Sequence, residues 1–255
     1  MLLENGRFDQ IPHEAELWAG TAYLAKGWPE RWVELCRNVY ARDPSTHAFA
    51  RASLVMALTM TGADDEAMAV SEGLLAAADA TGNPQVVCYA LMAYGIVHRN
   101  VDPMAAYEAH RRGLQIAQDS GNRFAESYHA GNLGRLAATH AEATDALDYV
   151  TVAIRNFHDS GSFSILPSAI ALLAMLLDRL GHYEPAATIS GFAATAFTRT
   201  TNPEFDTTIA HLREVLGDQT YESLARKGET MTIAAVAAYA YGQIDQARTE
   251  LEHPS

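Results

Sequence analysis

Apolar residues recur at intervals of three and four along most of the chain, as at Leu54, Val55 and Leu58. This spacing places them on one face of an α-helix, whereas a half-buried β-strand would alternate apolar and polar residues. Glycine, often followed by proline or asparagine, interrupts the pattern and leaves segments of helical length. The pattern therefore predicts an all-α protein. The predicted glycine breaks are Gly27, Gly62, Gly82, Gly121, Gly161 and Gly181.

The predicted helical segments repeat in sequence. Three of them end in Ala80-Thr81-Gly82, Asp119-Ser120-Gly121 and Asp159-Ser160-Gly161, which are spaced 39 and 40 residues apart. Two antiparallel helices approach closely only where their side chains are small, and one such hairpin cannot bury its apolar face alone. Stacked hairpins are therefore predicted, with an irregular helical bundle as the alternative. The small residues in phase are Ala67, Ala106, Ala146 and Ala186; Gly95, Gly134 and Ala174; and Gly113, Ala153 and Ala193.

These positions resemble the tetratricopeptide-type repeat family. The shared feature is a small residue inside the first helix of a pair, a second early in the next helix and a third seven residues later, as at Gly134, Ala146 and Ala153. The resemblance implies a right-handed superhelix, or solenoid, of antiparallel helical hairpins.

We predict one continuous structural domain with three parts. Residues 1–43 form an N-terminal helical pair or cap, 44–201 form four hairpin repeats of about 40 residues, and 202–255 form C-terminal capping helices. Aromatic residues concentrate in the first part, where we expect them to serve capping or packing. They are Trp18, Tyr23, Trp28 and Trp32.

The C-terminal part carries a second resemblance, at Leu216-Gly217, Tyr221, Gly228 and an alanine-rich helix that includes Ala238. It is similar to the end of the repeat region in large actinobacterial regulators. Those proteins join an ATPase module to helical repeats, some with a LuxR-type DNA-binding domain and some with a cyclase domain. The resemblance implies a regulatory sensor or interaction arm. The chain itself has no Gly-x4-Gly-Lys-[Ser/Thr] phosphate loop.

The charge balance narrows the classes of partner. Lys and Arg number 18 against 31 Asp and Glu, so the formal net charge is −13. Binding to nucleic acid or to an anionic membrane surface needs clustered positive charge, so we expect no direct contact with either. Cys36 and Cys88 form neither a disulfide framework nor a metal-ligand pair at their spacing, and we expect two buried thiols. A cytoplasmic location fits this composition best, and no apolar stretch approaches the roughly 20 residues of a membrane span.

Catalytic patterns are missing from the sequence. There is no Gly-x-Ser-x-Gly elbow, no Gly-rich dinucleotide fingerprint, and no pair of histidines at i, i+4 spacing that could share a metal ion. We therefore expect a chain that is not an enzyme and that uses no cofactor and no metal.

A solenoid binds through the surface that its first helices line. We take the in-phase residue of each first helix (Met56, Gly95, Gly134 and Ala174) as the packed position. Residues six and three before it, and one and four after it, then share another face of the helix. Tyr and Arg often anchor interfaces, which makes this face a candidate concave groove. In the alternative interpretation, the tyrosines pack between repeats and the arginines pair with local carboxylates. The candidate residues, with two at the rim, are Tyr89, Met92, Arg99, Asn100, Tyr128, Arg135, Ser168 and Arg179.

Two functions remain open from the sequence. In the first, the chain is a non-catalytic regulatory or scaffold module that binds a protein or peptide partner in the groove. In the second, it is a sensor of a small molecule or peptide that controls a partner ATPase, cyclase or DNA-binding protein. A sensor needs an enclosed apolar pocket and a scaffold needs an open, charged trough. A homodimer is a further possibility, because the N-terminal pair or the alanine-rich tail helix could present an apolar face.

Overall fold

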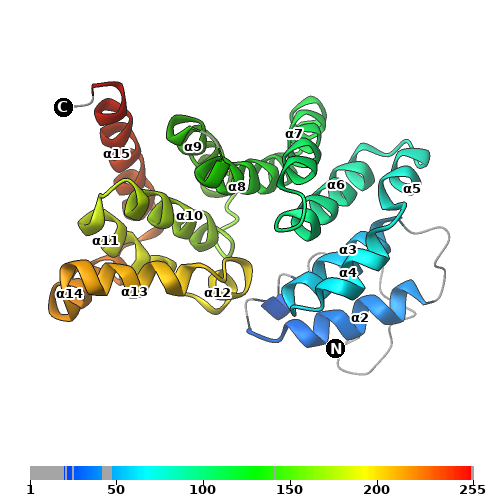
Figure 1. Cartoon of the computed structure of the whole chain (residues 1–255), viewed down its shortest axis with the longest axis horizontal. Coiled ribbons are helices and arrows are strands. Elements are labelled where there is room, and N and C mark those ends of the chain that lie inside the picture. The colour runs from blue at the N-terminus through cyan, green and yellow to red at the C-terminus, as the bar shows by residue number, and fades with distance from the viewer. Residues whose placement is uncertain (1–19, 21, 25, 42–47, 141, 254–255) are drawn as a thin grey trace. The chain divides into compact units, whose positions relative to one another are not determined.

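The computed structural model describes residues 20, 22–24, 26–41, 48–140 and 142–253. Every regular element within these ranges is a helix, which confirms the all-α prediction (Figure 1). The chain divides into two compact units, Met1–Ala125 and Glu126–Ser255, and the division falls inside the predicted repeat region. No helix in the described ranges is long and apolar enough to cross a membrane.

Beside the helical residues 20 and 22–24, the described part of the first unit contains six helices with defined bounds, followed by the start of α8. They are α2 (Pro29–Tyr40), α3 (Ala48–Met60), α4 (Asp64–Ser71), α5 (Leu74–Ala80), α6 (Pro84–His98), α7 (Pro103–Ser120) and α8 (Arg123–His140). The second unit holds the rest of α8 and all later helices. These are α9 (Ala143–Asp159), α10 (Leu166–Arg179), α11 (Tyr183–Ala193), α12 (Ala196–Thr201), α13 (Phe205–Leu216), α14 (Asp218–Glu229) and α15 (Ile233–Glu252).

The six predicted glycine breaks lie at turns of the structure. All six predicted glycine breaks have φ between 62° and 83°, the left-handed region that favours glycine. Asparagine and aspartate then start the next helices: Asn83 Oδ1 accepts a hydrogen bond from Gln85 N (3.0 Å), and Asp102 Oδ1 accepts one from Ala105 N (3.0 Å). Proline occupies the first turn of α6 and α7, where its missing N–H costs nothing.

One predicted helix is two helices in the structure. The segment between Gly62 and Gly82 breaks at Gly73, whose φ is +71°, and separates α4 from α5. Arg51 on α3 donates from Nε to the carbonyl of Val70 (2.6 Å) and from Nη2 to the carbonyl of Glu72. The guanidinium group thus satisfies carbonyls that the end of α4 leaves without a helical partner, which offsets the cost of the break.

The N-terminal aromatic residues are only partly described. Trp18 lies outside the described residues, whereas Trp32 is fully buried in α2. Gly20 lies against it so closely that a Cβ there would overlap the indole ring. Trp28 is exposed, with Lys26 Nζ 5.2 Å from its ring centroid. Packing therefore accounts for Trp32 but not for Trp28.

Small residues bring the helices of each unit into close contact, as predicted. In the first unit, a Cβ at Gly95 on α6 would overlap the buried ring of His110 on α7. In the second unit, a Cβ at Gly134 on α8 would lie 2.8 Å from Val150 Cγ2 on α9. Both glycines belong to the in-phase set that the repeat pattern identified.

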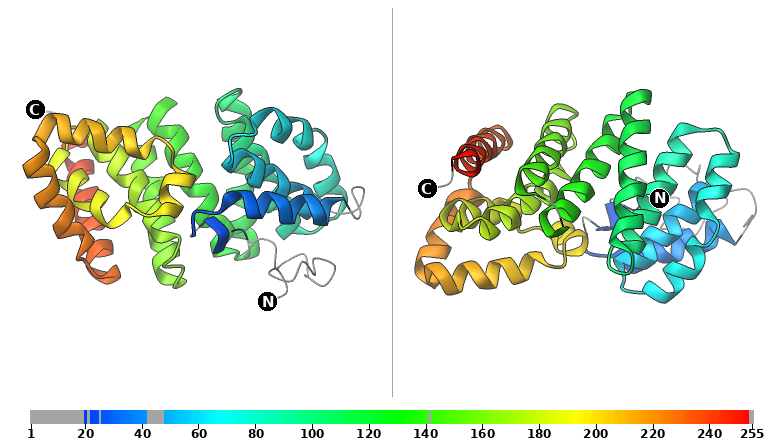
Figure 2. Two further views of the ribbon diagram at one scale, coloured as in Figure 1. Left: turned by 90° about the horizontal axis from the view of Figure 1, so that it is seen from below. Right: turned by 45° about the horizontal axis from the view of Figure 1, so that its top comes forward.

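The closest contact in the second unit joins α11 to α14 (Figures 1 and 2). A Cβ at Gly191 would overlap the carbonyl of Ala225, and a Cβ at Gly228 would overlap the carbonyl of Thr188. The two backbones therefore touch at two points. Tyr221 on α14 adds a buried hydroxyl contact of 3.1 Å to Ser190 Oγ on α11.

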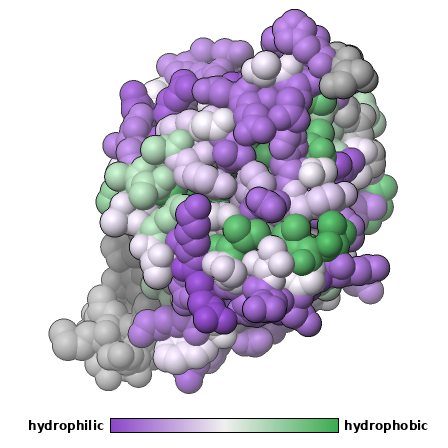
Figure 3. Space-filling view, turned by 90° about the vertical axis from the view of Figure 1, so that its left-hand side faces the viewer, coloured by the Kyte–Doolittle hydropathy of each residue, from purple (hydrophilic) through white to green (hydrophobic). Residues whose placement is uncertain are grey.

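The last helix, α15, packs on α9 and also contacts α10 and α11. Arg248 Nη2 lies 2.6 Å from Asp148 Oδ1 and 3.2 Å from Thr151 Oγ1, so a guanidinium group joins α15 to α9. The side of the molecule in Figure 3 is mostly hydrophilic, with hydrophobic residues in several separate patches. The large hydrophobic residues exposed in the described part of this unit are Phe163, Val215 and Leu251.

We predict opposite effects of alanine at two helical glycines. Gly228→Ala forces α14 away from the Thr188 carbonyl. It should lower the free energy of unfolding by about 1 to 3 kcal/mol, the usual range for overpacked cores. Gly242→Ala on α15 is the matched control, because nothing lies within 4 Å of its Cβ. There alanine raises helix propensity and stabilises by up to about 1 kcal/mol. Urea unfolding followed by circular dichroism measures both, and a shift of both variants in the same direction would contradict the assigned contact.

Candidate functional site

The first unit contains a groove of about 610 Å³ between α5, α6 and α7. Most of its lining is apolar and comes from all three helices. One face of α7 supplies a polar edge, because residues three and four apart lie side by side on a helix. The apolar lining is Leu75, Leu91, Tyr94, Ala105, Ala109 and Ile116, and the polar edge is Glu108, Arg111, Arg112 and Gln115.

The polar edge of this groove is exposed and carries both signs of charge. Arg112 Nη2 lies 2.6 Å from Asp79 Oδ1 on α5, and Arg111 Nη2 lies 2.8 Å from Glu108 Oε2 on the same helix. Exposed ion pairs add little to stability, so a ligand can exchange with them at small cost. The groove therefore offers an apolar surface beside exchangeable hydrogen-bond donors and acceptors.

Tyr94 is the aromatic residue of the groove, and its ring is held in place by the next turn of α6. It stacks on the His98 ring with centroids 3.8 Å apart and an interplanar angle of 20°. His98 Nδ1 lies 2.9 Å from the Tyr94 carbonyl, which fixes the imidazole. A ring restrained in this way loses little conformational entropy when a ligand binds to it.

The candidate groove residues of the first unit do not lie here, and two of them require correction. Tyr89 and Met92 were predicted on an accessible face, but they are only 4% and 1% exposed. Helix α3 packs across that face of α6: Phe49 stacks on Tyr89 with ring centroids 4.4 Å apart. Arg99 is half-buried at the end of α6, and Asn100 is exposed just beyond it. Tyr89 therefore agrees with the alternative interpretation, in which the tyrosines pack between predicted repeats.

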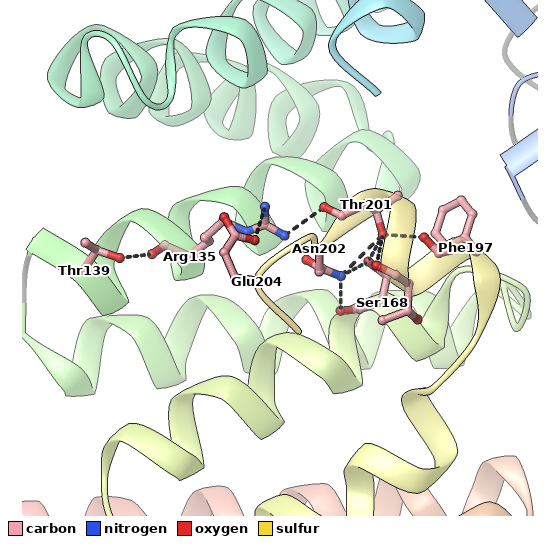
Figure 4. A network of polar contacts seen from close by, with 8 residues as sticks. Arg135, Thr139, Ser168, Phe197, Thr201, Asn202 and Glu204 are labelled. Atoms are coloured by element: carbon pink, nitrogen blue, oxygen red, sulfur yellow. Dashed lines mark hydrogen bonds and ion pairs between the residues drawn. The ribbon is translucent and has the colours of Figure 1, made fainter. Parts of the chain in front are cut away.

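In the second unit, Arg135 and Ser168 both hold the connection between α12 and α13 (Figure 4). Arg135 Nη2 donates to the Thr201 carbonyl (3.0 Å), and Ser168 Oγ lies 2.9 Å from Thr201 Oγ1. The buried Asn202 donates from Nδ2 to Ser168 Oγ (2.8 Å). Side chains from α8 and α10 thereby determine where this connection and the following Glu204 lie.

Arg135 and Arg179 meet at a small pocket of about 90 Å³. Glu204 also lines it, with Oε2 3.7 Å from Arg135 Nη1. Tyr128 takes no part in this pocket and packs edge-on against Phe157, with ring centroids 6.0 Å apart. The pairing of Arg135 with Glu204 agrees with the alternative interpretation, in which the arginines pair with nearby carboxylates.

Sequence reasoning missed several residues that the structure brings to these sites. The polar edge of the first groove belongs to a second helix, α7, whereas the prediction considered first helices only. Its signal was available, because Glu108, Arg111 and Gln115 follow helical spacing on one face. Glu204 and Thr201 had no such signal, since only the Asn202-Pro203 break marked their segment.

Neither a metal-binding cluster nor a matching protein family assigns a function to these two sites. Within the described ranges, no group of three or more His, Cys, Asp or Glu side chains is placed to hold a metal ion. No family model matches the chain, and no curated protein matches its sequence. The functional proposal therefore depends on the geometry of the two sites.

We predict that the native protein resists alkylation at Cys88. The thiol is buried, with Sγ 3.5 Å from the Gly113 carbonyl, and burial raises its pKa from 9.0 to about 11. At about pH 8 only about one thiol in a thousand is then ionised, and the thiolate is the reactive form. Cys36 is buried as well.

Because the Cys88 pKa is higher in the folded state, its contribution to stability is complete below pH 9.0 and is lost as the pH rises through about 11. Maleimide labelling read by intact mass measures the reactivity. Both thiols should label in urea and neither in buffer at about pH 8. Rapid labelling of the folded Cys36→Ser variant would contradict the burial of Cys88.

Proposed function

We propose that this chain is a non-catalytic protein-interaction module of tetratricopeptide type, built as a right-handed superhelix of antiparallel helical hairpins. A peptide segment of a partner protein binds in the groove formed by α5, α6 and α7. The regulatory role implied by the C-terminal resemblance, in a bacterial transcriptional or signalling regulator of the cytoplasm, belongs to the same proposal.

The groove itself carries the proposal. Its volume of about 610 Å³ is large enough for several side chains of a peptide, and its apolar lining runs across three helices. Peptides that bind to helical scaffolds bury apolar anchors and exchange polar contacts at the edges. An apolar lining beside the exposed Arg111, Arg112, Glu108 and Gln115 meets both requirements.

The stacking of hairpins is supported by two contacts, one in each unit. Gly95 and Gly134 are 39 residues apart, and each lies where a Cβ would collide with the next helix. Equivalent positions thus make equivalent helix contacts, as a repeat architecture requires.

The open form of the groove in the first unit favours a peptide over a small-molecule ligand at this site. A site for a drug-sized ligand encloses roughly 300 to 1,000 Å³. The groove of the first unit reaches this volume but is open, and the pocket of the second unit is only about 90 Å³. An open trough with charged edges is the arrangement expected of a scaffold.

We expect peptides selected from a random display library on the wild-type chain to bind in this groove. Tyr94→Ala removes the aromatic contact and Arg112→Ala removes an edge donor, so each should weaken binding by about tenfold, which corresponds to about 1.4 kcal/mol. Fluorescence anisotropy with the selected peptides measures the affinities.

Arg226→Ala on α14 is the matched control, since it removes an exposed arginine that is not among the residues lining the groove. It should leave peptide affinity unchanged. Selected peptides that bind the Tyr94→Ala, Arg112→Ala double variant as tightly as the wild type would refute the assignment of this groove, as would a library that yields no binder.

A further inference from the structure

The small pocket of the second unit has an excess of positive charge. Arg135 from α8 and Arg179 from α10 line it, and Glu204 at the start of α13 is the one carboxylate among its lining residues. Two guanidinium groups and one carboxylate give these lining residues a formal charge of +1, although the chain carries −13 overall. A net positive pocket in an acidic protein is a place where an anion is favoured.

The two arginines differ in mobility. Arg135 is only 11% exposed in its side chain and is held by the Thr201 carbonyl at 3.0 Å (Figure 4). Arg179 is exposed at the end of α10, so its guanidinium can adjust to a ligand. A fixed cation beside an adjustable one suits a small oxyanion, because a guanidinium can bind two oxygens in parallel.

Glu204 is loosely held in the pocket. Its Oε2 lies 3.7 Å from Arg135 Nη1, longer than the roughly 2.7 to 2.9 Å of a charge-assisted hydrogen bond. Its side chain is 48% exposed, and it makes no capping hydrogen bond to α13 although it occupies the N-cap position. The carboxylate therefore behaves as a replaceable counterion.

We propose that this pocket binds a phosphoryl dianion, which displaces the Glu204 carboxylate from Arg135. A phosphate ester carries about −1.5 to −2 charges at pH 7 and three acceptor oxygens, so it can engage both guanidinium groups. A monoanion offers no more charge than Glu204, which is already tethered in place. The volume of about 90 Å³ corresponds to roughly three water molecules, enough for one tetrahedral oxyanion.

This site does not depend on the peptide groove, which lies in the other unit. The phosphoryl group has two possible sources, free inorganic phosphate or a phosphorylated serine of a partner. Both present the same chemistry to Arg135 and Arg179. The test therefore uses inorganic phosphate, a capped Gly-phosphoserine-Gly peptide, the unphosphorylated peptide, and acetate as a monoanion.

Isothermal titration of the full chain, at constant ionic strength in phosphate-free buffer, measures the dissociation constants. Wild type should bind the phosphoryl probe saturably, but neither acetate nor the unphosphorylated peptide. Arg179→Gln should weaken binding by about tenfold. Glu204→Gln should tighten binding by about two- to fivefold, because it removes the competing carboxylate. Arg226→Gln, which removes an exposed arginine outside the pocket, should bind as wild type does.

The unequal effects expected of Arg179→Gln and Arg226→Gln separate a specific site from general electrostatic attraction, under which both arginine variants would lose affinity equally. Binding of the phosphopeptide at least as tightly as phosphate assigns the site to a phosphorylated partner, and binding of inorganic phosphate alone assigns it to the free anion. Either result supports the dianion site. The proposal is overturned if neither phosphate nor the phosphopeptide binds saturably to the wild type or to Glu204→Gln. It is also overturned if Arg179→Gln binds phosphate as tightly as the wild type does, or if the wild type binds acetate as tightly as phosphate.

Discussion

Close approach at glycine is the constraint on which the packing in both units depends. At Gly228 and Gly191 the backbones of α14 and α11 touch, and at Gly95 a histidine ring occupies the space of a Cβ. Contacts this close determine the distance between helices, and the larger apolar residues then fill the space beside them. Glycine at these positions therefore allows dense helix packing, because either a second backbone or a buried ring fills the space of the missing Cβ.

The connection between α12 and α13 shows how such packing creates chemistry. Arg135 on α8 and Ser168 on α10 hold Thr201 and Asn202, and this places Glu204 against the guanidinium of Arg135. The hydrogen bonds of Arg135 and Ser168 to this connection are structural, but the ion pair between Arg135 and Glu204 is long and its carboxylate is half-exposed. Arg135 is therefore firmly held, whereas the Glu204 carboxylate can be exchanged for another anion.

The two candidate sites differ in the ligand that each suits. The groove of the first unit is broad and mainly apolar, with balanced charges along α7, so recognition there depends on buried area and adjustable polar contacts. The pocket of the second unit is small and positively charged, so recognition there depends on charge and geometry. Peptide recognition and anion recognition are therefore separable properties of one chain.

The sequence by itself determined the helices and their ends, because apolar spacing, left-handed glycines and capping residues such as Asn83 act within a few residues. The repeat pattern also identified Gly95 and Gly134 as positions where helices meet, but not Gly191 and Gly228. Which face of α6 is accessible was decided only by tertiary structure, because α3 covers Tyr89 and Met92 from a distant part of the chain. The break at Gly73 and the position of Glu204 were likewise decided by long-range contacts with arginine, which local spacing does not encode.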